Sequence, residues 1–355
     1  MSQSVSHQRF EIAYSTHHKQ VDAQIAQLLK DVADPFDRRL LIEMVVSVYR
    51  LGEKRSSTGD LKILNTALKE LRYAFEIFRP YRHVRKVALF GSARISSRHS
   101  AYREAKAFGR LMNGAGWMVI TGAASGIMRA GHEGAGSDRS FGLNIRLPFE
   151  QKANVVIAQD PKLINCKYFF TRKLLFIKES HATVLFPGGF GTLDEGFESL
   201  TLVQTGKSDP RPIVFVESPD RPFWRPLLRF FEQKLVREGM ISPSEKGIYQ
   251  VARSAQEAVD KVRQFYHVYH SMRSVGSVLA MRLSHRLSDA SVEDLNLRFR
   301  DLLASGTIRQ AGALREEGDE PELEGLTRLL LRFDRKSYGR LIQMIHRINS
   351  YASGS

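Results

Sequence analysis

Three short apolar runs near the middle of the chain each end in a glycine-containing turn that leads into a helical pattern. The runs are "KVALF" at 86–90, "WMVIT" at 117–121 and "ATVLF" at 182–186, and the turns are "GSAR", "GAASG" and "PGGFGT". Strands that alternate with helices of about ten to fifteen residues indicate βαβ units, and near-continuous apolar strands are typical of sheets covered on both faces. We therefore predict an α/β fold with a doubly wound parallel sheet and helices on both faces.

The alternation of strands and helices is confined to residues 83–265, which we interpret as a Rossmann-like nucleotide-binding domain. Residues 1–82 show helical spacing only, in about three segments, and form a predicted N-terminal helical extension. Residues 266–355 are predicted to be a mainly helical C-terminal extension, in which 266–283 is interpreted as a helix. Within the central domain, "NVVIA" at 154–158 is interpreted as a strand.

The net charge of +15 raises the question of an anionic partner. Residues 83–265 contain 27 Lys and Arg but only 17 Asp and Glu, a net charge of +10, so most of the excess lies with the glycine-rich turns. We find no basic low-complexity run and no known nucleic-acid module. The charge favours an anionic ligand and, taken alone, leaves open whether that ligand is a mononucleotide or a polymer.

The chain has a single cysteine, Cys166, so an intrachain disulfide is excluded, and we interpret this residue as a buried thiol in a reducing compartment. We see no signal peptide and no apolar run close to the roughly 20 residues of a membrane helix. We therefore expect a cytoplasmic location and no membrane partner.

The glycine-rich turns are the predicted ligand site, because ligands of open parallel sheets bind outside the carboxyl ends of the strands. Glycine lets a ligand approach the backbone, and the helix that follows directs free N–H groups and its positive end toward a phosphate. The candidate binding residues are Gly91, Ser92, Gly122, Gly126, Gly188, Gly189, Gly191 and Thr192. Their spacing matches neither the dinucleotide fingerprint nor the P-loop. The alternative, glycines that only permit tight turns, is disfavoured because three such turns share one edge.

Carboxylates follow the third turn, and Asp194 and Glu195 lie in the first turns of the predicted helix. Acidic residues there commonly complement the helix dipole, but Glu195 is also close enough to reach a sugar attached to a bound phosphate. Arg172 and Lys173, on the preceding predicted helix, are the candidate cations beside it. His132 lacks the H-E-x-x-H partner, so we interpret it as solvated and predict no metal site.

The segment "PGGFGTLDE" at 187–195 resembles the hallmark P-G-G-x-G-T-x-x-E of the LONELY GUY family of nucleoside 5′-monophosphate phosphoribohydrolases. The family's upstream Arg-Lys pair matches Arg172 and Lys173 in "FFTRKLLF", and the flanks resemble those of the longer bacterial members. One departure is visible, since Ala123 and Ala124 stand where the family usually has consecutive glycines. We expect their methyl groups to lie near the ligand and to affect base or sugar preference.

The resemblance implies hydrolysis of the N-glycosidic bond of a nucleoside 5′-monophosphate, AMP-like or a cytokinin ribotide, to free base and ribose 5-phosphate. It implies that Glu195 and Arg172 are catalytic, that Lys173 and Asp194 help to bind the substrate, and that the glycine loop holds the phosphate. No cofactor is expected. The family also implies a homodimer, whereas nucleic acid is not expected as a partner. Separately, the roughly 85 residues before the core and 90 after it exceed what catalysis needs, and we expect them to bind a regulatory nucleotide or to build a larger homo-oligomer. The alternative is a nucleotide or molybdenum-cofactor carrier that does not hydrolyse its ligand.

Overall fold

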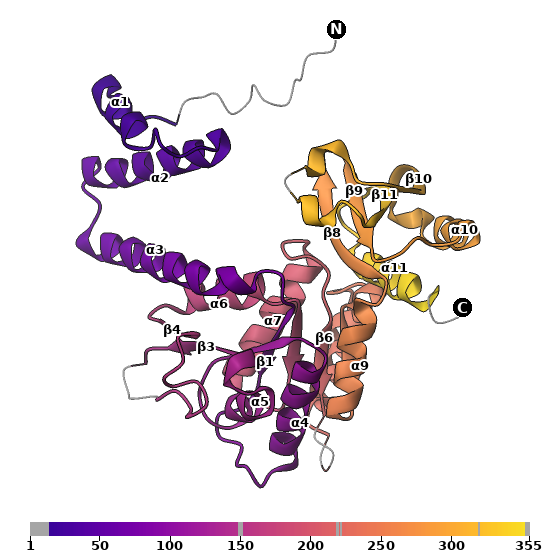
Figure 1. Ribbon diagram of the computed structural model, residues 1–355. Coiled ribbons are helices and arrows are strands. Elements are labelled where there is room, and N and C mark those ends of the chain that lie inside the picture. The colour runs from indigo at the N-terminus through magenta and orange to yellow at the C-terminus, as the bar shows by residue number, and fades with distance from the viewer. Residues whose placement is uncertain (1–13, 148–151, 218–219, 221, 319, 352–355) are drawn as a thin grey trace. The chain divides into compact units, whose positions relative to one another are not determined.

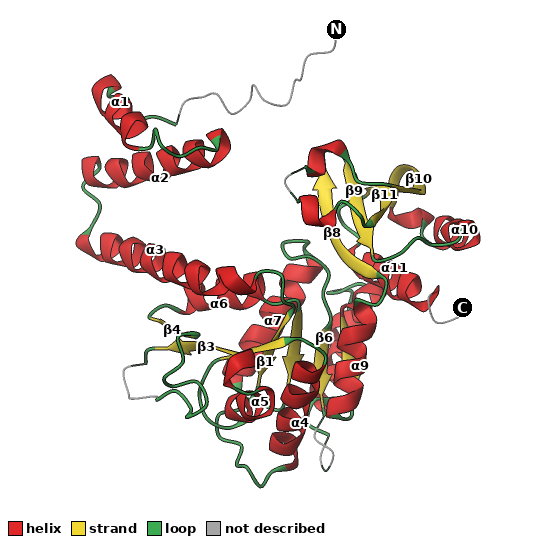
Figure 2. Cartoon of the chain, in the orientation of Figure 1, coloured by secondary structure: helices red, strands yellow, loops and turns green. Residues whose placement is uncertain are grey.

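Seven parallel strands form the main sheet of the protein (Figures 1 and 2). They are β1 (Lys86–Phe90), β2 (Met118–Thr121), β3 (Ser140–Ile145), β4 (Leu163–Cys166), β5 (Ala182–Leu185), β6 (Ile213–Val216) and β7 (Tyr249–Ala252). The order across the sheet is β4-β3-β2-β1-β5-β6-β7, so the chain runs outward from β1 in one direction and then returns to its other side. The predicted doubly wound parallel sheet is confirmed, and its topological switch point lies between β1 and β5.

The structure is a computed structural model that describes residues 14–147, 152–217, 220, 222–318 and 320–351. The chain divides into two units, Met1–Lys69 and Glu70–Ser355, which are described separately. Among the helices of the described residues, none combines the length and the apolar character that crossing a bilayer requires.

Helices cover both faces of the main sheet (Figure 2). One face carries α4 (Ser100–Gly114), α5 (Ile127–Ala135) and α9 (Ala255–Phe265). The other carries α6 (Phe169–Glu179), α7 (Phe190–Gln204), α8 (Arg225–Phe230) and the end of α3 (Thr58–Phe78). Val87 and Leu89 of β1 pack into the first layer, and Ala88 and Phe90 pack into the second, because successive side chains of a strand point to opposite faces. All four side chains are buried, which explains the continuous apolar pattern of β1.

The smaller unit contains α1 (Lys19–Leu28), α2 (Pro35–Glu53) and the beginning of α3. The Asp34 carboxylate caps α2 by accepting hydrogen bonds from the backbone N–H groups of Phe36 and Asp37, at 2.8 and 2.9 Å, and Pro35 occupies the first helical position. Three α-helices in the described part of residues 1–82 agree with the sequence prediction. The boundary between the two units, after Lys69, falls within the last of them, α3.

A second, antiparallel sheet forms near the C-terminus, in the order β10-β11-β9-β8 (Figure 1). Its elements are β8 (Tyr269–Val275), β9 (Val278–Leu283), α10 (Asp289–Arg298), β10 (Leu303–Ala311), β11 (Thr327–Phe333) and α11 (Tyr338–Tyr351). The prediction of a mainly helical extension over residues 266–355 is therefore wrong. Residues 269–283 form a hairpin in which Val275 pairs with Val278 around a two-residue turn, and Gly276 supplies the positive φ (+59°) that the turn requires.

The predicted strand at 154–158 is also wrong, because these residues form turns and β4 provides the edge of the sheet instead. The backbone N–H of Asn154 donates to the carbonyl of Ala123 at 2.8 Å, so it is committed to a loop contact outside any ladder. The remaining helical segments of the described residues are short. They are η2 (Arg79–Tyr81), η3 (Ser137–Arg139), a π-helix (Phe231–Val236), η5 (Pro243–Ile248), η6 (Arg300–Leu302), η7 (Arg315–Glu317) and η8 (Pro321–Leu323).

A buried ionic cluster holds the second sheet to the loop that precedes β11. Glu317, Arg282 and Arg328 are 4%, 2% and 0% exposed, and the Glu317 carboxylate accepts hydrogen bonds from both guanidinium groups at 2.7 and 3.1 Å. Burial alone would raise the pKa of Glu317. Hydrogen bonds from Arg328, the Leu314 backbone and Arg282 outweigh burial and bring this pKa to about 2.

We expect Glu317→Gln to lower the free energy of unfolding by about 3 kcal/mol at pH 7, because it leaves buried guanidinium charge without its partner. The pKa of Glu317 is lower in the folded chain than in the unfolded chain. Its stabilising effect is therefore complete above pH 4.5 and is lost as the pH falls toward 2. Urea unfolding between pH 7 and pH 2.5 measures both effects. The exposed neighbour Glu316→Gln is the matched control, and equal stability of the two variants at pH 7 would contradict the assignment.

Candidate active site

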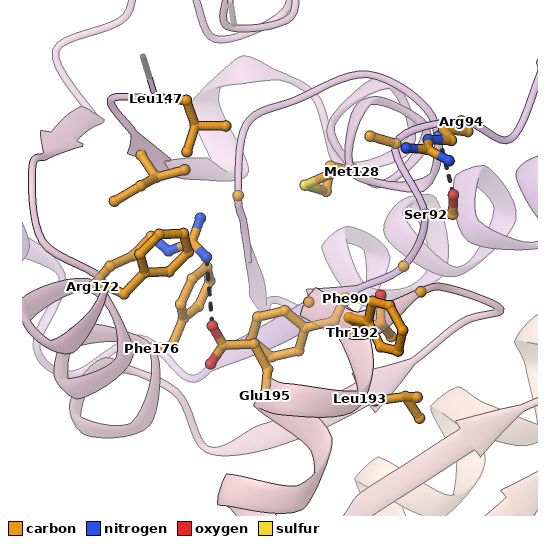
Figure 3. A pocket seen from close by; sticks show the side chains of 18 residues that line it. Phe90, Ser92, Arg94, Met128, Leu147, Arg172, Phe176, Thr192, Leu193 and Glu195 are labelled. Carbon is orange, nitrogen blue, oxygen red and sulfur yellow. Dashed lines mark hydrogen bonds and ion pairs between the residues drawn. The ribbon is translucent and has the colours of Figure 1, made fainter. Parts of the chain in front are cut away.

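A cleft of about 640 Å³ opens at the carboxyl ends of β1, β2 and β5 (Figure 3). All three glycine-rich turns contribute to its lining. The predicted binding residues that line it are Gly91, Ser92, Gly122, Gly189, Gly191 and Thr192, together with Arg172 and Glu195. The cleft therefore lies at the topological switch point, where open parallel sheets bind ligands.

Backbone hydrogen bonds join the three turns into one frame. The Ser92 N–H donates to the carbonyl of Pro187 at 3.0 Å, which links the turns after β1 and β5. The Ile127 N–H donates to the carbonyl of Ser92 at 3.0 Å, and the Ser125 hydroxyl donates to the carbonyl of Ala93 at 2.9 Å. These two bonds link the turns after β1 and β2, so the floor of the cleft is held by contacts between turns.

The glycines of the cleft have two different roles. Gly126 has a φ of +63°, and a side chain there would overlap the carbonyl of Ser92. A side chain at Gly188 would overlap Thr192. These two residues do not line the cleft but permit the close packing that shapes it. Gly189 and Gly191, in contrast, have open space where a Cβ would stand, so their backbone is accessible to a ligand.

Glu195 is the buried carboxylate of the cleft. It lies on the second turn of α7, is 3% exposed and points toward Arg172 (Figure 3). Its Oε1 is 3.6 Å from Arg172 Nη2, and its Oε2 is 3.6 Å from Lys173 Nζ. Burial raises the pKa of Glu195, and the two cations reduce the shift without abolishing it. The carboxylate thus faces the cleft with a raised proton affinity.

Arg172 lies on α6, and its guanidinium packs 5.0 Å from the ring centroid of Phe169 and 5.8 Å from that of Phe176. Burial lowers the pKa of Arg172, although the nearby Glu195 counteracts this effect. Arg172 Nε and Glu195 Oε1 are both buried, and neither has a hydrogen-bond partner among the residues that the structure describes. Such groups cost about 1–3 kcal/mol each and are characteristic of sites that complete their hydrogen bonds with a ligand.

Lys173 and Asp194, both predicted to bind substrate, do not line the cleft. Lys173 Nζ lies 2.8 Å from Asp194 Oδ2 and 2.7 Å from Glu198 Oε2, behind Glu195. Burial lowers the pKa of Lys173, but hydrogen bonds with Asp194 and Glu198 outweigh it and raise the pKa above its ordinary value. Lys173 is therefore a fixed positive charge that acts on Glu195 from the side away from the cleft.

His132 is buried, so its interpretation as a solvated residue is wrong. Its Nε2 lies 3.0 Å from Thr121 Oγ1 and 3.1 Å from the carbonyl of Phe141. Burial lowers the pKa of His132 to about 4, although its hydrogen bonds oppose the shift, so the ring is neutral at pH 7. Asn154 contacts the same ring and donates to the carbonyl of Ala123 at 2.9 Å, so the network supports the second glycine-rich turn.

Ala123 and Ala124 are buried and do not line the cleft, so the expectation that their methyl groups lie near the ligand is wrong. Ala123 has a φ of +61° and directs its Cβ toward Gly142 on β3. Sequence reasoning also missed the apolar wall of the cleft, which includes Phe90, Met128, Ile145, Leu147, Phe169 and Phe176. Phe90 and Met128 could have been found from their position next to the glycine-rich turns.

Cys166 is buried on β4, as predicted, and burial raises the pKa of its thiol to about 11. The thiol is therefore protonated at neutral pH and is a poor nucleophile. Among the described residues, no three His, Cys, Asp or Glu side chains gather in a way that could hold a metal ion. The chemical groups of the cleft are the Glu195 carboxylate, the guanidinium groups of Arg94 and Arg172, the hydroxyls of Ser92 and Thr192, and the free backbone of a helix N-terminus.

We expect Gly188→Ala to lower the free energy of unfolding by about 1–3 kcal/mol, because the new methyl group displaces Thr192. Gly189→Ala is the matched control, since its methyl group enters open space and should change stability by less than about 0.5 kcal/mol. Urea unfolding of both variants measures the difference. Equal destabilisation by the two substitutions would show that Gly188 is not a packing requirement.

Residues 121–262 match the family model described as "Possible lysine decarboxylase". A probable cytokinin riboside 5′-monophosphate phosphoribohydrolase of Oryza sativa subsp. japonica is 37% identical over 106 residues, which are 30% of this chain and 47% of that protein. A cytokinin riboside 5′-monophosphate phosphoribohydrolase of Arabidopsis thaliana is 39% identical over 95 residues, 26% of this chain and 42% of that protein. The predicted resemblance to the LONELY GUY family is confirmed for this part of the chain. The chain spans less than half the length of these two relatives.

Among solved structures, the molybdenum cofactor binding protein from the phototrophic bacterium Rippkaea orientalis matches part of the chain. It is 18% identical, with a TM-score of 0.35, over 51% of this chain and 94% of that one.

Proposed function

We propose that this chain hydrolyses the N-glycosidic bond of a nucleoside 5′-monophosphate, releasing the free base and ribose 5-phosphate. The observation that carries the proposal is the buried Glu195 carboxylate, which faces Arg172 beside an accessible glycine loop. Both groups retain an unpartnered polar atom at the cleft. The relatives named as phosphoribohydrolases support a hydrolase of this kind.

The loop at the start of α7 suits the phosphate of the nucleotide. Gly189 and Gly191 present accessible backbone, and Thr192 adds a hydroxyl group to the same lining. The N-terminus of α7 contributes free N–H groups and a positive partial charge. A phosphate bound there anchors the substrate and fixes the ribose over Glu195, one helical turn further along α7.

Glu195 would stabilise the positive charge that develops on the ribose as the bond to the base breaks, the logic used by glycosidases. A water oxygen attacks C1′ and gives one proton to the Glu195 carboxylate. The electron pair of the C1′–N bond leaves with the base, which takes up a proton to become the free base, and Glu195 gives up the proton that it received, so that its carboxylate is restored. The raised pKa of Glu195 favours this role, because a general base works best when its pKa lies near the working pH.

Arg172 would hold the ribose and stabilise the negative charge that develops on the departing base. Its guanidinium is fixed by Phe169 and Phe176. The apolar wall next to it offers a surface for the ring of the base, which would lie among Met128, Ile145 and Leu147. We propose AMP-like nucleotides, including cytokinin ribotides, as the substrate class.

Glu195→Gln is the first test of the proposed chemistry. We expect the variant to bind AMP but to release adenine about 10²- to 10⁴-fold more slowly than wild type, because a single positioned acid–base group contributes that much. We also expect its free energy of unfolding at pH 7 to equal or exceed that of wild type, because a raised pKa means that ionised Glu195 destabilises the folded chain. Chromatography of free base and urea unfolding measure the two effects.

Glu198→Gln is the matched control, because Glu198 lies on the same helix and also contacts Lys173 without lining the cleft. Turnover of Glu195→Gln equal to that of this control would contradict the catalytic assignment. The substrate panel is AMP, GMP, CMP and UMP. Binding without base release from any of them by wild type would favour the carrier alternative. Salt-dependent binding of DNA or RNA that mononucleotides do not displace would favour a nucleic-acid partner.

The pH dependence provides a second test. The rate should fall as the pH drops through the raised pKa of Glu195, above the 4.5 of an ordinary glutamate. Lys173→Met removes a cation that lowers this pKa, so we expect the acid limb of kcat/KM to move to higher pH. The control is Lys234→Met, whose exposed ion pair with Glu238 lies outside the cleft lining. A shift toward lower pH would contradict the role of Lys173.

Several expectations from the sequence stay predictions. These are the cytoplasmic location, the homodimer or larger homo-oligomer, the regulatory nucleotide and the boundaries of a central domain at 83 and 265. Size-exclusion chromatography with light scattering would measure the oligomeric state of the full chain.

A further inference from the structure

We propose that Glu70, on the C-terminal part of α3, is a positioning residue that places Arg172 in the cleft. Glu70 belongs to the predicted N-terminal extension by sequence and is the first residue of the larger unit. The extension would thereby contribute directly to the construction of the site. The kinetic part of this inference rests on the proposed function, whereas its structural part does not.

The Glu70 carboxylate holds the beginning of α6 with both of its oxygen atoms. Oε1 accepts a hydrogen bond from the backbone N–H of Lys167 at 2.6 Å, across 97 residues of sequence. Oε2 accepts a hydrogen bond from the Thr171 hydroxyl at 2.6 Å. Lys167 lies just before α6 and Thr171 lies in its first turn, so one carboxylate spans the start of this helix.

The sequence of α6 supplies no cap of its own. Tyr168 occupies the N-cap position and makes no side-chain hydrogen bond to the first turn. Glu70 brings a negative charge to this end of the helix, where the dipole is positive. Its hydrogen bonds are charge-assisted and therefore stronger than those between neutral groups. The start of α6 consequently depends on a side chain from a distant part of the chain.

The part of α3 that carries Glu70 is itself firmly held. Ala74 and Phe78 are buried in the core beneath the sheet, and the Phe78 ring stacks on Phe141 with 4.3 Å between centroids. Further along the two helices, Lys178 Nζ of α6 lies 4.7 Å from the ring centroid of Phe75. The part of α3 that carries Glu70 is therefore held in the core. It contacts α6 at two places, through Glu70 and through Phe75.

Arg172 directly follows Thr171, so a displacement of the first turn of α6 moves the guanidinium. The two rings against which the guanidinium packs, Phe169 and Phe176, lie on the same helix and move with it, and Glu195 Oε1 is 3.6 Å away. A misplacement of about 1 Å at a catalytic group can reduce the rate by about 10²-fold. Loss of Glu70 should therefore affect the step that uses Arg172 more than it affects binding of the phosphate at Gly189 to Thr192.

The test compares Glu70→Ala and Glu70→Gln with Glu76→Ala and Glu76→Gln in the full chain. Glu76 lies on the same helix and forms an i,i+4 pair with Arg72 on the surface, so it matches the change in charge and composition. Hydrogen–deuterium exchange of amides 167–173 reports the state of the start of α6. For Glu70→Ala we expect exchange there to increase about tenfold, with a smaller increase for Glu70→Gln, which keeps one acceptor oxygen.

Kinetics separate positioning from general stability. We expect Glu70→Ala to lower kcat for AMP about 10- to 100-fold while KM changes less than about threefold. In an Arg172→Ala background the same substitution should cause no further loss, because Glu70 acts through Arg172. An equal loss in both backgrounds, or wild-type exchange and kcat, would overturn the inference.

Failure of the proposed function gives a different pattern. If wild type releases no base from any nucleotide, the proposed function fails, and exchange of amides 167–173 alone decides the role of Glu70. Unchanged exchange in Glu70→Ala overturns the positioning role whatever the activity. If Glu70→Ala does not fold, the same exchange and kinetic measurements are compared between Glu70→Gln and Glu76→Gln.

Discussion

The hydrogen bond from the Ser92 N–H to the carbonyl of Pro187 is the contact on which the cleft depends. It extends the pairing of β1 and β5 beyond the ends of the strands, at the point where the chain order reverses. Because Gly126 packs against Ser92 from the other side, the turn after β2 is held by the same residue. Three loops from distant parts of the sequence thus share one backbone position, and the helix that follows β5 is aimed into the space between them.

The parallel sheet and the glycine-rich turns could be predicted from the sequence, because apolar strands, glycines and helical spacing are local patterns, whereas the strand order that places the switch point between β1 and β5 could not. The pairing of Glu195 with Arg172 was predicted from the resemblance to the LONELY GUY family. Other features depend on tertiary neighbours that no local pattern reveals. Because His132 lacks the H-E-x-x-H partner, the sequence predicted a solvated side chain. In the structure, Thr121, Phe141 and Asn154 enclose it. The hairpin at 269–283 was missed because its strands are rich in residues that also suit helices, although the Gly-Ser turn was a usable signal.

Two buried glutamates show how the surroundings set the chemistry of one residue type. Glu317 accepts hydrogen bonds from two arginines and a backbone N–H, and its pKa is lowered to about 2. Glu195 has two cations at 3.6 Å but an Oε1 without a partner, and its pKa is raised. The first arrangement satisfies the charge and stabilises the second sheet. The second leaves the charge incompletely satisfied, which costs stability and keeps the carboxylate available for reaction.

The contact between Glu70 and Lys167 also has a consequence during synthesis of the chain. The two partners are 97 residues apart, so at about 5–20 residues per second the ribosome makes Glu70 roughly 5 to 20 s before Lys167. Over that interval α3 can form, but its carboxylate has no partner, and β1 to β4 emerge before α6 does. The Arg172 guanidinium would then reach its final position late in folding, after the sheet that carries the rest of the site has begun to assemble.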